Sequence, residues 1–93
     1  MDAIKKGKNI FYVGDDVDHV SAKITFVHRG KDEIVIDHTF VSEPLRGQGV
    51  GLQLVKEAAE YARQENKKII PKCPFARKVM TNNDEYCDVL VKT

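Results

Sequence analysis

The sequence predicts an α+β fold with a mixed sheet: three antiparallel strands, then a strand–helix–strand crossover, then a short C-terminal helix. Two observations predict it. Apolar and polar residues alternate along residues 20–28, which is the period of a half-buried strand, whereas apolar residues recur every three or four positions in 51–65, which is the period of a helix. A length of 93 residues suits one domain, so we expect a single domain over residues 1–93.

The first half of the chain has the pattern of strands joined by turns. Residues 9–13 form a short β-prone run, and Gly14-Asp15-Asp16 follows as a turn. In residues 20–28, one face carries the apolar side chains of Val20, Ala22, Ile24 and Phe26. Residues 33–41 contain three consecutive apolar residues, which is typical of a strand covered on both faces. We therefore expect residues 33–41 in the interior of the sheet.

The second half of the chain predicts a helix, a strand and a shorter helix. The amphipathic helix runs from Gly51 to about Glu65, and a strand follows over residues 68–72. A parallel crossover should connect this strand to residues 33–41. Pro71 cannot donate a hydrogen bond to a neighbouring strand, so pairing should stop there. Pro74 begins the short helix, and residues 86–91 are either a last strand or an extended tail.

Composition narrows the classes of partner and the compartment. The 15 basic and 14 acidic residues are interspersed and give a net charge of +1, so we expect no nucleic-acid partner. The two cysteines lack CxxC spacing, and the aspartates of residues 15–18 lack the glycine and glutamate of a calcium loop, so we expect no metal. No apolar run approaches the roughly 20 residues of a membrane span, and no signal peptide is recognisable. We expect a cytoplasmic protein without a membrane partner, either a monomer or a weak homodimer.

The segment from Arg46 to Gly51 (Arg-Gly-Gln-Gly-Val-Gly) lies between a predicted strand and a predicted helix. Helix N-termini attract phosphate, because their first N–H groups are unpaired and the helix dipole is positive there. Glycine lets the backbone approach the anion, and a guanidinium from Arg46 suits phosphate geometry. A nucleotide-binding P-loop has Lys-Ser/Thr after its last glycine, but Leu52 and Gln53 stand there, so the segment is not a P-loop. A dinucleotide-binding fingerprint has a small residue where this chain has Leu52, so that motif fits poorly. A glycine-rich turn without a ligand is the alternative.

The loop matches the pattern Arg/Gln-x-x-Gly-x-Gly/Ala at Arg46, Gly49 and Gly51, and so resembles the signature of the GCN5-related N-acetyltransferases. The stretch from His38-Thr39-Phe40-Val41 to residues 71–75 (Pro-Lys-Cys-Pro-Phe) is similar to a very short subgroup of that family. The resemblance covers about residues 33–90 and implies a fold that binds acetyl-CoA or coenzyme A and transfers acetyl to an amine, whose identity it leaves open. Longer members carry two helices after the first strand, where this chain has only a turn.

The resemblance also implies where the cofactor lies. The strands before and after the long helix splay apart, and the pantetheine arm bonds to the backbone of Phe40 and Val41, with the Val41 N–H on the acetyl carbonyl. The loop amides hold the pyrophosphate. Apart from the resemblance, the predicted short helix carries Arg77 and Lys78, which are within reach of the 3′-phosphate, and solvated surface charge is the equal alternative. The cofactor-binding residues expected are Phe40, Val41, Arg46, Gly47, Gln48, Gly49, Val50, Gly51, Phe75 and Lys78.

Two residues are candidates for catalysis, Cys73 and His38. Pro74 favours the first position of a helix, which makes Cys73 the N-cap, where thiols have lowered pKa values and become better nucleophiles. By alternation His38 shares a face with Ile34 and Ile36, so its imidazole could lie near the thiol as a base. The alternatives are a buried inert cysteine, direct attack by the amine without an acyl-enzyme, and a non-catalytic acyl-CoA sensor or interaction module.

Overall fold

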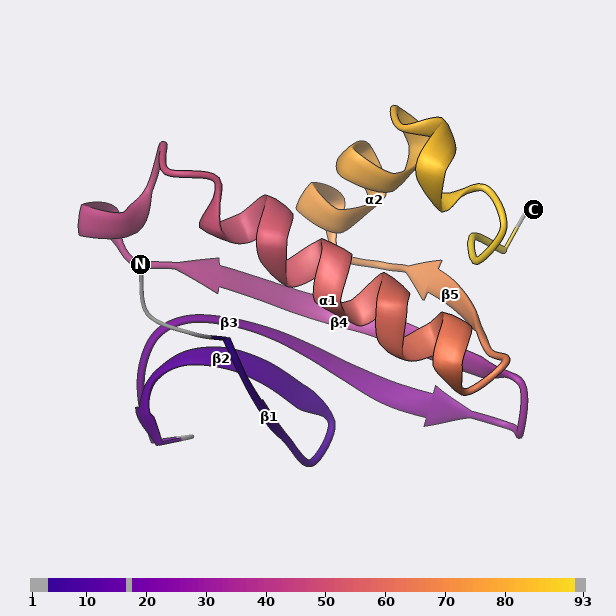
Figure 1. Ribbon diagram of the computed structural model, residues 1–93, viewed down its shortest axis with the longest axis horizontal. Coiled ribbons are helices and arrows are strands. Elements are labelled where there is room, and N and C mark those ends of the chain that lie inside the picture. Colours follow the sequence, from indigo (N-terminus) through magenta and orange to yellow (C-terminus); the bar gives the residue numbers. More distant parts are fainter. Residues whose placement is uncertain (1–3, 17, 92–93) are drawn as a thin grey trace.

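The computed structural model describes residues 4–16 and 18–91, and its centre is a five-stranded sheet in the order β1-β2-β3-β4-β5 (Figure 1). The strands are β1 (Lys5–Gly7), β2 (Ile10–Asp16), β3 (His19–Arg29), β4 (Glu33–Val41) and β5 (Lys68–Pro71). The helices are α1 (Val50–Gln64) and α2 (Pro74–Thr81), with short 3₁₀ turns η1 (Glu43–Leu45) and η2 (Asp84–Tyr86). Strands β1 to β4 pair antiparallel, and β5 pairs parallel to β4. The predicted α+β architecture and the parallel crossover are confirmed.

The antiparallel part of the sheet has one strand more than the sequence predicts. β1 pairs with β2 from Lys5 opposite Tyr12 to Gly7 opposite Ile10, and Asn9 makes the turn between them at φ 60°. The segment carries no apolar alternation, because it is held by backbone pairing and its lysines stay exposed. One of them, Lys6, lies over the ring of Tyr61, with 5.0 Å between its Nζ and the ring centroid.

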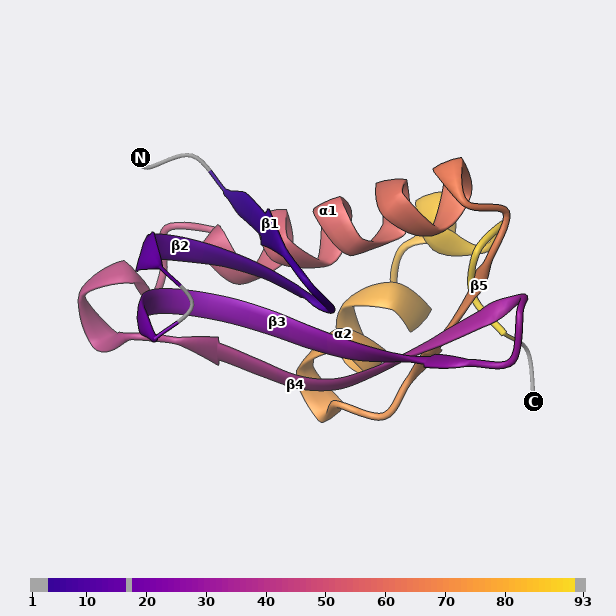
Figure 2. The same ribbon diagram turned by 90° about the horizontal axis from the view of Figure 1, so that it is seen from below.

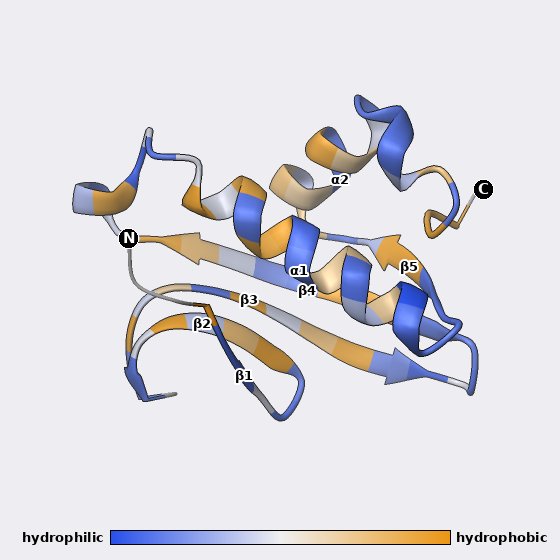
Figure 3. Ribbon diagram, in the orientation of Figure 1, coloured by the Kyte–Doolittle hydropathy of each residue, from blue (hydrophilic) through white to orange (hydrophobic). Residues whose placement is uncertain are grey.

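Helix α1 covers one face of the sheet (Figure 2). Its hydrophobicity alternates along the ribbon (Figure 3), because one stripe faces the strands and the other faces solvent. The buried stripe comprises Val50, Gly51, Leu54, Val55, Ala58, Ala59 and Ala62. It packs on Ala22, Ile24 and Phe26, the face of β3 that the alternation predicts.

A β-bulge interrupts β4 at Asp37 and decides which side chains face the helix. Thr25 pairs with His38 and the next residue, Phe26, pairs with Ile36, so Asp37 is an extra residue in β4. The Thr25 hydroxyl donates to Asp37 Oδ1 at 2.5 Å. Strand alternation changes phase at such a residue. Up to Ile36 the even-numbered side chains point toward α1, and beyond the bulge the odd-numbered ones do.

Strands β4 and β5 separate at Pro71. Ile36 opposite Pro71 is the last pair, and Lys72 N and Cys73 N then both donate to Ile36 O, at 3.0 and 3.1 Å. β4 continues to Val41 without β5 beside it. This is the interruption of pairing that Pro71 predicts.

The last part of the chain is mostly not a strand. After η2 it makes a single parallel bridge between Ile69 and Leu90. The Arg63 side chain holds this segment by bonds to the carboxylate of Asp88 and the carbonyl of Glu85. Both descriptions predicted for residues 86–91, a last strand and an extended tail, are therefore wrong, because η2 and a turn closed by bonds from Val89 N and Leu90 N to Tyr86 O occupy most of this segment. Over the described residues, no helix has the length and apolarity that crossing a membrane requires.

Candidate functional site

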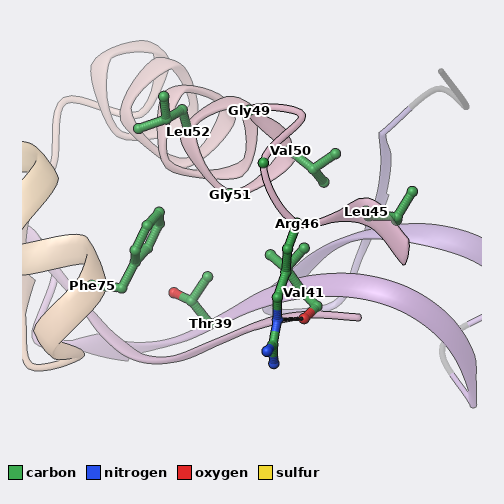
Figure 4. Close-up of a pocket in the computed structure, with 10 residues that line it drawn as sticks. Thr39, Val41, Leu45, Arg46, Gly49, Val50, Gly51, Leu52 and Phe75 are labelled. Carbon is green, nitrogen blue, oxygen red and sulfur yellow. Dashed lines mark hydrogen bonds between the residues drawn. The ribbon is translucent and has the colours of Figure 1, made fainter. Parts of the chain in front are cut away.

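A cleft of about 620 Å³ lies between the end of β4, the start of α1 and the start of α2 (Figure 4). Its lining residues are Thr39, Val41, Leu45, Arg46, Gly47, Gly49, Val50, Gly51, Leu52 and Phe75. A cleft of this size with a largely apolar wall suits a ligand larger than a simple anion.

The glycine loop forms one end of the cleft and supplies free N–H groups. Gly49 is the N-cap of α1 with φ 79°, and Gly47 has φ 82°. Residues other than glycine rarely adopt these backbone conformations. The first bond inside the helix runs from Gln53 N to Gly49 O at 3.0 Å, so the amides of the preceding turn have no acceptor in the helix. A Cβ built on Gly47 or Gly49 meets no atom within 4 Å, so this loop borders open space. The residues present therefore fit a diphosphate.

Gly51 allows the aromatic ring of Phe75 to approach α1. A Cβ at Gly51 would lie 2.8 Å from Cζ and 3.0 Å from Cε2 of Phe75. Figure 4 shows the ring aimed at this turn of the helix, with Thr39 below it. The glycine thus sets the distance between two walls of the cleft.

Arg46 lines the cleft and lies beside the end of β4. Its Nε donates to the carbonyl oxygen of Val41 at 3.0 Å (Figure 4). In this conformation the side chain ties the loop to the end of β4, a contact that the sequence does not reveal, because Val41 precedes Arg46 by five residues in an irregular segment.

The free edge of β4 forms another wall. The bond from Ser42 N to Ser21 O, at 2.8 Å, points the backbone groups of Ser42 toward β3. Backbone groups alternate in direction along a strand, so those of Thr39 and Val41 point away from β3, into the gap that β5 leaves. Because the Val41 carbonyl accepts from Arg46, the Val41 N–H is the group of this edge that an extended ligand can bond as a strand would.

Cys73 is the N-cap of α2 and lies next to Thr39, but it is not one of the residues that line the cleft. The residue is buried, and its Sγ donates to Thr39 Oγ1 at 3.4 Å. Burial raises the pKa of the thiol, but the hydrogen bond with the Thr39 hydroxyl and the nearby main-chain amides of Ala76, Phe75 and Thr39 outweigh it. The pKa is therefore below its ordinary value, in the direction that favours a nucleophile.

His38 does not accompany Cys73. Because of the bulge at Asp37, His38 pairs with Thr25 on the face of the sheet opposite Ile34 and Ile36, and it is exposed. The prediction that His38 shares the face of Ile34 and Ile36 is wrong. The structure brings Thr39 to the thiol instead.

The other expected cofactor-binding residues divide into two groups. Val41, Arg46, Gly47, Gly49, Val50, Gly51 and Phe75 line the cleft, whereas Phe40, Gln48 and Lys78 do not. Phe40 is paired with Lys23 on the far face, 38% exposed, and Gln48 donates its side-chain amide to Pro44 O. Lys78 is exposed on α2.

Three residues that line the cleft, Thr39, Leu45 and Leu52, are not predicted from the sequence. The adjacent polar residues Asp37 and His38 break the alternation of β4 and are the signal that would have located Thr39. Over residues 4–16 and 18–91, no three His, Cys, Asp or Glu side chains are grouped as a metal site.

Comparison with known proteins identifies the family. The model for the GCN5-related N-acetyl-transferases matches residues 10–89. A GCN5-like protein of Staphylococcus aureus, solved by NMR, is 46% identical, with a TM-score of 0.83 over 98% of this chain and 89% of that one. No protein of curated function matches the sequence.

More distant structures share the fold. An acetyltransferase of the same family from Staphylococcus aureus has a TM-score of 0.63 at 14% identity, over 80% of this chain and 49% of that one. Tetrahymena GCN5 has a TM-score of 0.61 at 12% identity, over 90% of this chain and 60% of that one. The family match over residues 10–89 and the 46% identity together show that the chain belongs to the GCN5-related N-acetyltransferase family.

Proposed function

We propose that the protein binds acetyl-CoA in the cleft and transfers the acetyl group to an amine, with Cys73 as the first acceptor. The observation that carries the proposal is the continuity of the cleft, which runs from the unpaired amides of α1 along the free edge of β4 to Thr39. These are the groups that a ligand with a diphosphate and an extended amide arm requires.

Each part of the chain has a role in this proposal. The amides at the start of α1 bind the pyrophosphate, Val41 offers its backbone to the pantetheine arm, and Gly51 leaves room beside Phe75. Acetyl-CoA supplies an activated thioester. Cys73 Sγ attacks the thioester carbonyl, an S–C bond to Cys73 forms, the bond to the CoA sulfur breaks, and the thiol proton leaves on CoA. An amine then takes the acetyl group from Cys73 and restores the thiol.

The binding step is tested by a thermal-shift titration with acetyl-CoA, CoA and NAD. We expect saturable stabilisation by the first two and none by NAD, since a ligand that binds the folded state raises its stability with concentration. Mass spectrometry of the protein incubated with acetyl-CoA should then find the acetyl group on Cys73 in the wild type and none in Cys73→Ser. Absence of any CoA-dependent shift would refute the proposal.

A second function, an acyl-CoA sensor without turnover, is favoured by the connection between β2 and β3. β2 ends at Asp16 and β3 begins at His19, so there is no room for the helices that shape the acceptor side in longer members. Chromatographic measurement of CoA released in the presence and absence of an amine separates the two functions. A sensor would bind CoA and release no more CoA than the amount of protein present.

A further inference from the structure

We propose that Thr39, a residue of the cleft wall, is a positioning residue whose hydroxyl holds Cys73 Sγ next to the cleft. The inference rests on the proposed function for its consequence, acyl transfer, but the contact itself is a property of the protein alone. It assigns to Thr39 the partnership with the thiol that the sequence suggests for His38.

The bulge at Asp37 makes this contact possible. Without the extra residue, strand alternation would turn Thr39 to the far face and His38 toward α1. With it, Thr39 pairs with Ile24 on the helix side of the sheet. The Thr39 side chain thereby faces both the cleft and the thiol.

The hydroxyl of Thr39 is the hydrogen-bond partner of the sulfur. Its oxygen lies 3.4 Å from Sγ. A hydroxyl can accept a hydrogen bond from the S–H and, after rotation, donate one to the thiolate. A bond to the charged form is the stronger of the two, so it favours ionisation.

The other groups that act on the thiol are neutral. They are the amides of Phe75 and Ala76 in the first turn of α2, and burial works against them. No charged side chain contributes among the described residues, and His38 lies on the opposite face. The hydroxyl of Thr39 is therefore the side-chain group whose removal by a single substitution should change the ionisation of the thiol.

The experiment is a titration of thiolate absorbance at about 240 nm, with no cofactor present. Cys87→Ser removes the other cysteine of the chain, so that Cys73 gives the signal, and the Cys73→Ser/Cys87→Ser protein provides the blank for tyrosine ionisation. In the Cys87→Ser background, Thr39→Val keeps the shape of the side chain and removes the hydroxyl, while Thr39→Ser keeps the hydroxyl.

We expect Thr39→Val to move the thiol titration to higher pH, and Thr39→Ser to return it toward that of the parent protein. The rate of Cys73 acetylation by saturating acetyl-CoA at neutral pH should fall by about threefold or more in Thr39→Val and recover in Thr39→Ser. Urea unfolding of each variant checks that the fold is retained, and a variant that fails to fold is replaced by Thr39→Ala.

The outcomes separate this inference from the proposed function. A titration of Thr39→Val that superimposes on the parent would overturn the role of Thr39, even if CoA binds. A shifted titration in a protein that binds no CoA would support the role of Thr39 and reject the proposed function. A shift of equal size in Thr39→Ser and Thr39→Val would also overturn it, because the hydroxyl would then not be the cause.

Discussion

Gly51→Ala tests whether the distance between α1 and Phe75 controls cofactor binding. The new Cβ would lie 2.8 Å from Cζ of Phe75 and 3.6 Å from Cγ2 of Val41. Carbon atoms in contact are about 3.5–4.0 Å apart, so the ring must move by about 0.7–1.2 Å. The ring is 40% exposed and can rotate, but this movement changes a wall of the cleft.

The change in stability should be small. Alanine is favoured over glycine by up to about 1 kcal/mol in a helix, and less in its first turn. Displacing a half-exposed ring loses a similar amount, so we expect the free energy of unfolding to change by less than about 1 kcal/mol. The affinity for CoA should fall by about tenfold or more, which corresponds to about 1.4 kcal/mol. Gly51→Ala should therefore weaken CoA binding without a comparable loss of folding stability.

The assay is calorimetric titration with CoA, together with urea unfolding, for Gly51→Ala, Phe75→Ala and the double variant. If the clash with the ring is the cause, Gly51→Ala should cost much less affinity when Phe75 is already alanine. A Gly51→Ala protein that binds CoA within about twofold of the wild type would show that this contact does not limit the cleft.

Two further predictions concern the loop and the C-terminal segment. Gly49→Ala and Gly30→Ala place alanine at φ 79° and 64° without a nearby atom, so each should destabilise the fold by about 1–2 kcal/mol, but only Gly49→Ala should weaken CoA binding in calorimetry. The Arg63 guanidinium holds the pKa of Asp88 below its ordinary value. A carboxylate whose pKa is lower in the folded state than in the unfolded state stabilises the fold at pH values above the unfolded pKa, and this contribution is lost as the pH falls. Between about pH 5 and pH 2, the free energy of unfolding measured in urea should therefore decrease more for the wild type than for Asp88→Asn. An equal loss in both proteins would contradict this.

The sequence predicts the parts of the fold that depend on side-chain periodicity. α1 is found because its apolar residues recur every three or four positions, and the end of β5 is found because proline lacks an N–H. β1 is not found, since Lys5–Gly7 pairs through its backbone and has no buried alternation. The contact between Arg46 and Val41 is not predicted either, because it depends on the path of an irregular segment and not on side-chain periodicity.

The face of β4 on which His38 lies differs from the prediction for another reason. A period of two assumes that no residue is inserted, and one bulge residue reverses every assignment after it. Ile34 and Ile36 therefore follow the expected pattern, while His38 and Phe40 do not. A polar pair such as Asp37-His38 within a buried strand indicates that a bulge residue can be present, so the residues after it can lie on either face of the sheet.

The short connection between β2 and β3 bears on the order of events at the site. The segments that we propose to bind the cofactor, β4, residues 46–51 and α1, follow one another in the sequence, so a small chain can contain all of them. An acceptor site like that of longer members would need an insertion between Asp16 and His19, where the sequence has only Val17 and Asp18. In the proposed function, the first acceptor is the thiol of Cys73, next to Thr39. We therefore expect one acetyl group per protein to reach Cys73 at a rate independent of amine concentration, whereas direct attack by an amine would release no CoA until the amine is added. Rapid-quench mass spectrometry across a range of amine concentrations distinguishes these orders, and a rate of CoA release proportional to amine from the first turnover would exclude the acyl-enzyme.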